Sequence, residues 1–146
     1  MRARVCGLYH REGQLLMVNH RGLAGADFWA PPGGGIALYE TAEESLVREF
    51  REETGLVVRV KNYLFVAEFI GAPLHSLELF FEVECLEGDL KTGSDPEMRR
   101  QDQIITQVRF LNWEQISAIA PRHRHGLFSL VHSPAQIFGL RGYFKL

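Results

Sequence analysis

The chain has 146 residues, 46% of them hydrophobic and 23% charged, which predicts one globular domain, residues 1–146, with a single sizeable core. Its formal net charge is −2 at pH 7, so it lacks the strong basic balance of proteins that bind long nucleic acid. No amino-terminal run is typical of a signal peptide and no segment approaches 18 apolar residues, so we expect a cytoplasmic protein without membrane contact.

The hydrophobic pattern along the chain predicts a mixed α/β (α+β) fold. In chain order, the expected elements are strands at Arg4–Tyr9 and Gln14–Asn19, a turn at Pro31–Gly35, a helix at Ala42–Thr54, strands at Val57–Ile70 (with or without a break), Leu77–Leu86 and Thr106–Asn112, a helix at Trp113–Ile119, and a closing strand at Gly139–Leu146. Cys6 and Cys85 lie in apolar stretches, so we expect two buried thiols and no disulfide framework.

The longer predicted helix has clear signals at both ends. Thr41 and Glu44 form the S/T-x-x-E arrangement that satisfies the free amides of a helix start. Gly55 can adopt the left-handed conformation that ends a helix. An apolar stripe that should pack under the sheet recurs every four residues, at Ala42, Leu46 and Phe50. The prolines and glycines of Pro31–Gly35 cannot cheaply continue a strand, so they predict a turn before this helix.

Three carboxylates crowd one edge of the same helix. Glu49, Glu52 and Glu53 are spaced i, i+3 and i+4, which places them within an arc of about 100°. Each pair of like charges at that spacing costs a few tenths of a kcal/mol, roughly. An acidic helix flank alone is more often a solvated face, but a hard divalent cation such as Mg2+ would relieve the repulsion and keep positions open for water and phosphate. Arg48 can hold a neighbouring carboxylate by a bidentate pair.

These residues belong to a longer pattern. From Gly34 to Leu56 the chain reads GGIALYETAEESLVREFREETGL, which is G-x5-E-x7-R-E-U-x-E-E-x-G-U with U a bulky apolar residue. The pattern resembles the signature of the Nudix hydrolases, and every defined position is matched. Tyr39 precedes Glu40, where many members of that family carry glycine, so we expect a differently shaped turn into the helix. The resemblance implies an α/β/α sandwich around a mixed β-sheet.

The resemblance also implies a reaction, in which water attacks phosphorus and hydrolyses a nucleoside diphosphate linked to another moiety. The three glutamates would hold Mg2+, for which Mn2+ can substitute, and the ions would neutralise the pyrophosphate and activate water. Glu52, Glu53 or a loop acid would take the proton of that water. Arg48 would orient a metal-binding carboxylate. Gly34 and Gly35 would let the backbone turn tightly near the phosphates and offer amides to them.

Related enzymes often supply one further acid from a loop before a late strand, as a metal ligand or general base. In the segment from Ser94 to Gln103, Glu97 and Asp102 are the candidates for this role, with Asp95 behind them. Arg99 and Arg100 in the same segment can clamp phosphate or be solvated.

Several other side chains are candidates for substrate binding. Arg21 can reach a substrate phosphate or be a solvated strand-end residue, and Trp29 can be a core aromatic or a wall of the nucleotide pocket. His123 and His125 lie in a small basic cluster that is either solvated or an anion contact. The phenylalanines that can stack on a base, or lie in the core, are Phe28, Phe69 and Phe80.

The substrate stays open among modified nucleoside triphosphates, ADP-ribose or another nucleotide sugar, and dinucleoside polyphosphates. Pro73 lies slightly beyond the spacing seen in some ADP-ribose enzymes of the family, which favours ADP-ribose-like compounds weakly. One alternative is a non-catalytic nucleotide-sensing module, a class that often loses acids of this signature. The other is a family member that acts on RNA ends or assists a protein partner. A homodimer is expected from the resemblance. An apolar tail can form a protein interface or a core strand: Ile137, Phe138, Leu140, Tyr143 and Phe144.

Overall fold

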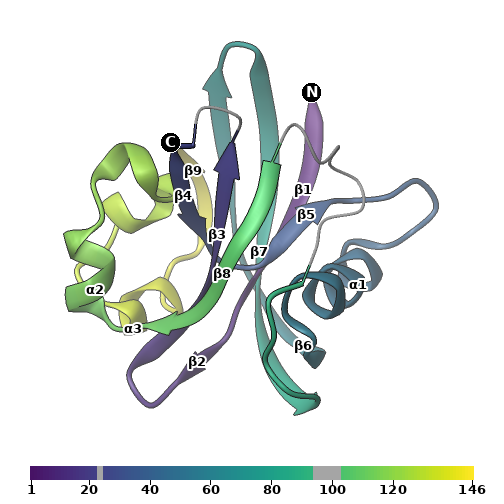
Figure 1. The fold of residues 1–146 in the computed structure, drawn as a ribbon. Helices are drawn as coiled ribbons and strands as arrows, with labels where there is room; N and C mark the ends of the chain where they lie inside the picture. Colours follow the sequence, from purple (N-terminus) through teal and green to yellow (C-terminus); the bar gives the residue numbers. More distant parts are fainter. Residues whose placement is uncertain (23–24, 94–102) are drawn as a thin grey trace.

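The computed structural model describes residues 1–22, 25–93 and 103–146. Its strands are β1 (Arg2–Leu8), β2 (His10–Arg11), β3 (Gln14–Gly22), β4 (Asp27–Ala30), β5 (Gly33–Gly35), β6 (Val57–Gly71), β7 (Leu74–Glu87), β8 (Gln103–Leu111) and β9 (Gly142–Lys145) (Figure 1). Its helices are α1 (Ala42–Thr54), α2 (Trp113–Ala118) and α3 (Pro134–Ile137), with short 3-10 turns η1 (Pro121–His123) and η2 (Gly126–Ser129).

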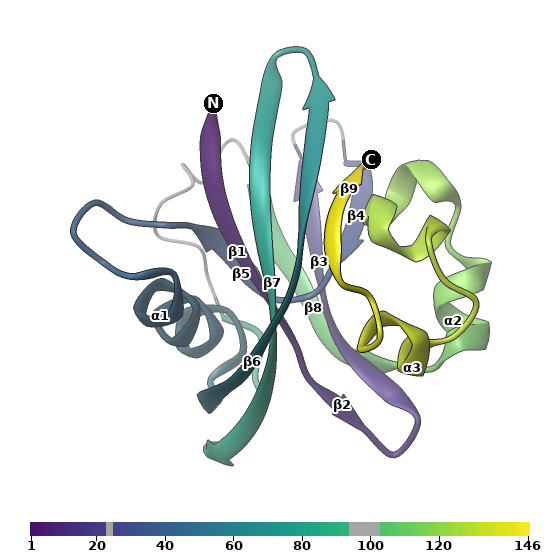
Figure 2. The ribbon, with the colours of Figure 1, turned by 180° about the vertical axis from the view of Figure 1, so that it is seen from behind.

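The strands form two sheets between layers of helix. One sheet has the order β5-β1-β7-β6-β9 and is mixed, because β1 pairs parallel with β7 and β6 pairs parallel with β9. In the other sheet β3 pairs antiparallel with β2, β4 and β8. Figures 1 and 2 show α1 on one side of the sheets and α2 with α3 on the other. The prediction of an α/β/α arrangement around a mixed sheet is confirmed.

Strand alternation divides the apolar side chains between two cores. The core that packs against α1 includes Val5, Leu16, Val18, Leu46, Phe50, Phe81 and Val83. The core on the opposite face, which packs against α2, η2 and α3, includes Cys6, Leu8, Leu15, Met17, Phe65, Phe80, Ile116, Leu127 and Ile137. Neighbouring residues of β1, β3 and β7 therefore alternate between the two cores, which fixes the face on which each polar residue of these strands lies.

Helix α1 has the predicted bounds and the predicted ends. The Thr41 hydroxyl accepts a hydrogen bond from the Glu44 amide at 3.0 Å, and Gly55 ends the helix in the left-handed conformation, with φ 78°. Leu46 and Phe50 are fully buried against the sheet. A Cβ on Gly7 of β1 would lie 2.3 Å from the Phe50 ring, so the absence of a side chain there lets α1 pack closely.

The predicted turn at Pro31–Gly35 is wrong in its second half, because Gly33–Gly35 is strand β5. It pairs antiparallel with β1, with Cys6 opposite Gly33 and Arg4 opposite Gly35. A Cβ on Gly33 would lie 2.1 Å from the Val5 carbonyl oxygen. Glycine is therefore needed at position 33 because the backbones of β5 and β1 approach closely there. Strands β2 and β4, of two and four residues, are too short to give a periodic signal.

The predicted β6 has no break, and its irregularities are register shifts against β7. Helix α2 begins at the capping box of Asn112 and Gln115 and ends near the predicted position. The expectation of a buried thiol holds for Cys6, whereas Cys85 is only partly buried.

The closing strand is shorter than predicted, because β9 covers only Gly142–Lys145 and pairs with Phe65–Glu68 of β6. Ile137 is fully buried, and Phe138, Leu140 and Phe144 pack against the core. Only Tyr143 of the apolar tail is strongly exposed, at 57%, so the tail is mostly core and not an exposed patch. No helix within the described ranges is long and apolar enough to cross a membrane.

Candidate active site

The centre of the site is the contact between α1 and the glycine strand β5. Glu49 and Glu53, one helical turn apart, are both fully buried. The Gly33 amide donates a hydrogen bond to Glu53 Oε1 at 2.8 Å. A Cβ on Gly34 would lie 2.4 Å from the carboxyl carbon of Glu49. Gly34 therefore leaves the space that the Glu49 carboxylate fills, and Gly33 binds the Glu53 carboxylate through its amide.

Arg48 joins the carboxylates of the site. Its Nε donates to both oxygens of Glu40 at 3.1 Å, and its Nη1 donates to Glu49 at 3.1 Å and to Glu52 at 3.3 Å. Burial alone would lower the pKa of Arg48, but the hydrogen bonds that it donates to Glu40 and Glu49 outweigh burial and raise that pKa above its ordinary value. The predicted carboxylate-holding role fits this geometry, with Glu40 as the bidentate partner.

Glu40 is held from the other side by Ser45. The Ser45 hydroxyl donates to Glu40 Oε2 at 2.7 Å and accepts from the Ala37 amide at 3.1 Å. The hydrogen bond from Ser45, followed by those from Arg48, keeps the pKa of Glu40 below its ordinary value. Arg48 is thereby anchored to the loop before α1 as well as to the helix.

The turn into α1 carries a residue in an unusual conformation. Tyr39 has φ 69°, in the left-handed region that glycine adopts easily and other residues avoid. Its side chain is 96% exposed. The turn is closed by the Glu40 amide, which donates to the Ala37 carbonyl at 3.1 Å. Tyrosine thus occupies a backbone conformation that suits glycine.

One further residue of the site was not predicted from the sequence. His20 of β3 places its Nε2 3.5 Å from Glu53 Oε2, and its side chain is 14% exposed. A signal was present, because Leu16 and Val18 belong to the core beneath α1 and the next residue on that face is His20. The pairing of β3 with β8 shifts register between Asn19 and His20, and the unpaired extra residue, Thr106, is on β8. The side chains of β3 therefore continue to alternate between the two faces of the sheet.

The donor chemistry of the site suits a hard divalent cation. Glu49, Glu52 and Glu53 offer carboxylate oxygens, which Mg2+ and Mn2+ prefer, and Gly34 leaves space beside Glu49. Within the described residues, no three His, Cys, Asp or Glu side chains are grouped so that they could hold one ion as they stand. Glu52, which bonds to Arg48, would have to turn toward an ion held by the other two.

The other predicted site residues have more varied positions. Arg21 forms an ion pair with Asp27 at 2.8 Å at the surface, with about half of its side chain exposed, as in the solvated alternative. Trp29 is buried in the core that faces α2, as in the core alternative. Gly35 lies in β5, opposite Arg4 of β1. Glu97 and Asp102, together with Asp95, Arg99 and Arg100, lie outside the described residues.

The phenylalanines considered for base stacking are divided by burial. Phe80 is fully buried and stacks on Phe65 with ring centroids 4.4 Å apart, so it is a core residue. Phe28 and Phe69 are partly exposed.

The basic cluster is not simply solvated. His125 Nε2 lies 2.5 Å from Glu78 Oε1, and Arg4 Nε donates to Glu78 Oε2 at 3.3 Å. Burial alone would raise the pKa of Glu78, but His125 and Arg4 outweigh it and lower that pKa to about 2. His123 Nδ1 contacts the Asp27 carbonyl at 2.9 Å. Both histidines therefore tie this segment to the sheets.

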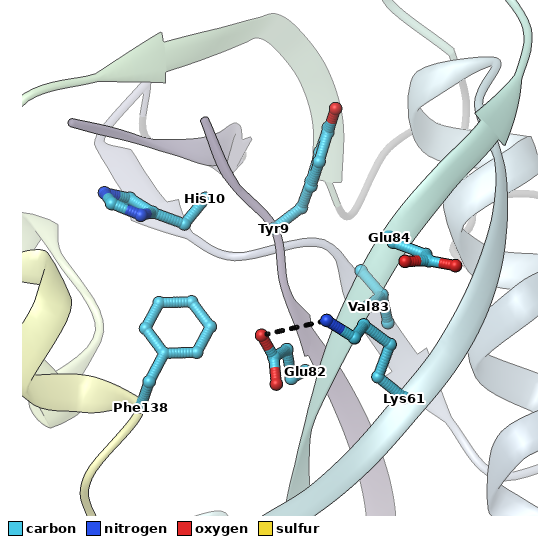
Figure 3. A pocket seen from close by; sticks show the side chains of 7 residues that line it. All are labelled: Tyr9, His10, Lys61, Glu82, Val83, Glu84 and Phe138. Carbon is cyan, nitrogen blue, oxygen red and sulfur yellow. Dashed lines mark ion pairs between the residues drawn. The ribbon is translucent and has the colours of Figure 1, made fainter. Parts of the chain in front are cut away.

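A separate pocket of about 220 Å³ contains none of the helix carboxylates (Figure 3). Its lining residues are Tyr9, His10, Lys61, Glu82, Val83, Glu84 and Phe138. The Lys61 ammonium of β6 lies 3.8 Å from the Glu82 carboxylate of β7 in this pocket, so the two charged groups partly neutralise each other.

Known proteins resemble this chain in both sequence and fold. A family model described as NUDIX domain matches residues 1–131. An ADP-ribose pyrophosphatase from Methanocaldococcus jannaschii is 32% identical over 93 residues, which are 62% of this chain and 55% of that protein. An RNA pyrophosphohydrolase from Cellvibrio japonicus is 45% identical over 49 residues, which are 34% of this chain and 28% of that protein. The match thus spans about half, or less, of either relative.

Among solved structures, a NUDIX hydrolase from Nitrosomonas europaea superposes with a TM-score of 0.76 and 19% sequence identity. The alignment covers 97% of this chain and 91% of the other. At this identity the likeness concerns the fold.

Proposed function

Because the chain belongs to the NUDIX domain family, we propose that it is a pyrophosphohydrolase that uses a divalent metal ion to cleave a nucleoside diphosphate derivative. One observation carries the proposal: two carboxylates, Glu49 and Glu53, are fully buried against a strand of glycines. Burying a carboxylate costs several kcal/mol, roughly, unless a partner compensates it. A fold selected for stability alone would not place two of them side by side.

Each side chain of the site has a distinct role in this mechanism. Glu49, Glu52 and Glu53 would hold the ion, which is Mg2+ or Mn2+ and which when bound supplies Lewis acidity and neutralises phosphate charge. Arg48 keeps the carboxylates of Glu49 and Glu52 oriented through its two hydrogen bonds. The Gly33 amide fixes one oxygen of Glu53, and the other oxygen lies 3.5 Å from His20 Nε2.

The proton of the attacking water needs an acceptor near the site. Of the three helix glutamates Glu49, Glu52 and Glu53, Glu52 is the one with a partly exposed side chain, at 27%. It can therefore reach a water molecule at the mouth of the site. We therefore favour Glu52 over Glu53 as the general base among the described residues. Glu97 and Asp102 remain proposals for the same role.

For the substrate, we favour a nucleoside diphosphate joined to a sugar, such as ADP-ribose. The archaeal relative is named an ADP-ribose pyrophosphatase, and the near-neutral charge of the chain suits a small substrate better than long RNA. The second relative, named an RNA pyrophosphohydrolase, matches over a third of the chain. Because of this relative, RNA ends are the competing substrate class. A homodimer stays a prediction.

The direct test is a screen of hydrolysis products with purified protein and Mg2+ or Mn2+. The panel contains ADP-ribose, nucleotide sugars, nucleoside triphosphates, dinucleoside polyphosphates and a 5′-triphosphorylated RNA, and it is repeated with Glu53→Gln. We expect cleavage of ADP-ribose to AMP and ribose phosphate, and a loss of turnover by orders of magnitude in the variant, because Glu53 is a proposed ligand of the ion. Glu43→Gln is the matched control, because Glu43 lies on the same helix but is exposed.

The outcomes separate the remaining alternatives. Near-normal turnover by Glu53→Gln would contradict the proposed mechanism. Pyrophosphate release from triphosphates without ADP-ribose cleavage would change the substrate class. Nucleotide binding without turnover anywhere in the panel would favour the non-catalytic sensing module.

A further inference from the structure

A histidine occupies the place of an aliphatic residue on the face of β3 that packs under α1. Leu16 and Val18 on this face are fully buried in the same core as Phe50. His20 continues the row and is 14% exposed. An imidazole at the end of an apolar row needs a polar partner. Here that partner is the carboxylate of Glu53.

The contact between the two groups is wide for a hydrogen-bonded pair. His20 Nε2 and Glu53 Oε2 are 3.5 Å apart. The other histidine–glutamate pairs of the described chain are closer, with 2.5 Å for His125 and Glu78 and 2.7 Å for His75 and Glu68. A charge-assisted hydrogen bond has a length of about 2.7–2.9 Å. The His20 pair is therefore spaced differently from both pairs that hydrogen-bond directly.

The spacing suits two ligands of one metal ion. Metal–nitrogen and metal–oxygen bonds to divalent ions are about 2.0–2.2 Å long. The 3.5 Å separation is less than twice such a bond, so an ion can contact both atoms without moving either side chain. The Gly33 amide bonds to Glu53 Oε1, and Oε2 is the oxygen that lies nearest His20 Nε2.

We propose that His20 Nε2 is a ligand of the ion that Glu53 binds, so that the site has a mixed nitrogen and oxygen donor set. This inference rests on the metal-dependent function proposed above and specifies which ion that function uses. Divalent first-row transition ions bind sites of mixed nitrogen and oxygen donors, with Mn2+ the weakest of that series, whereas Mg2+ takes oxygen donors almost entirely. The site should therefore prefer Mn2+ to Mg2+ more strongly than a site built from carboxylates alone.

Pulsed electron paramagnetic resonance of bound Mn2+ tests the ligand directly, because it detects a coordinated imidazole nitrogen without any turnover. The protein is prepared once with natural histidine and once with 15N-histidine. We expect a nitrogen signal that changes with the isotope and is absent in His20→Gln. Glutamine retains a group that can donate to Glu53. We also expect Mn2+ affinity to fall at least about tenfold in this variant, with Mg2+ affinity changed about twofold or less.

His75→Gln is the matched control. It removes an imidazole paired with a glutamate at the surface, so both the nitrogen signal and the Mn2+ affinity should be unchanged. Thermal unfolding without metal shows whether either variant is folded. Should His20→Gln fail to fold, the absence of an isotope-dependent signal in the wild-type protein would still overturn the assignment.

The results also distinguish this inference from the proposed function. Mn2+ binding without an imidazole signal, or equal loss of Mn2+ and Mg2+ affinity in His20→Gln, would overturn the assignment of His20 and leave the hydrolase proposal intact. If the wild-type protein bound neither ion, both proposals would fail together.

Discussion

The substitution Gly34→Ala tests whether the glycine strand exists to admit the helix carboxylates. The new methyl group would lie 2.4 Å from the carboxyl carbon and from Oε1 of Glu49, whereas ordinary contact begins at 3.4 Å. The carboxylate must therefore move by about 1 Å. Overpacking of this kind costs about 1–3 kcal/mol of stability. A displacement of about 1 Å at a reacting centre can lower turnover about 100-fold.

Urea denaturation and steady-state kinetics measure the two effects separately. We expect the free energy of unfolding to fall by about 1–3 kcal/mol and kcat/KM to fall by about 100-fold. Gly139→Ala is the control, because the nearest atom to a Cβ there is 3.5 Å away, and it should change neither quantity. Wild-type stability and activity in Gly34→Ala would refute the reasoning.

The double variant Gly34→Ala with Glu49→Asp refines the result. Aspartate is one methylene shorter, so its carboxylate retreats from the new methyl group. We expect the double variant to be more stable than Gly34→Ala but no more active, because the carboxylate no longer reaches its place beside Arg48. If the double variant were less stable than the single one, a clash with Glu49 would not be the cause.

Two further predictions concern the strained turn and the buried ion pair. Tyr39→Gly should raise the free energy of unfolding by about 0.5 kcal/mol, because φ 69° costs tyrosine about 1–2 kcal/mol and the larger backbone entropy of unfolded glycine offsets part of that gain; an unchanged or lower midpoint in urea would contradict this. For Glu78, the folded pKa of about 2 lies below the ordinary value of 4.5, so its ionisation contributes on the order of 3 kcal/mol above pH 4.5. That contribution is lost as the pH falls from 4.5 toward 2, and Glu78→Gln should therefore flatten the dependence of stability on pH in this window. Equal slopes for both proteins in acid unfolding would show that the ion pair with His125 is not the cause.

The local part of the site could be predicted from the sequence, because it depends on a single helix. Thr41, Gly55 and the apolar stripe define α1 through interactions within a few residues of one another. Once the helix is defined, its period places Glu49, Glu52 and Glu53 on one edge, and Arg48 lies within reach of them. The structure has this helix with the predicted bounds.

The rest of the site depends on contacts between segments that are distant in the sequence. The glycines of β5 indicate a turn locally, but pairing with β1 makes them a strand, and packing against α1 gives them their role. His20 lies beside Glu53 only because β3 passes the end of α1. Arg4 and His125 meet Glu78 across β1, β7 and the η1–η2 segment. A sequence determines which helix forms and which residues share its faces, whereas the packing of sheets and helices decides which distant side chains face those residues, since that depends on the whole fold.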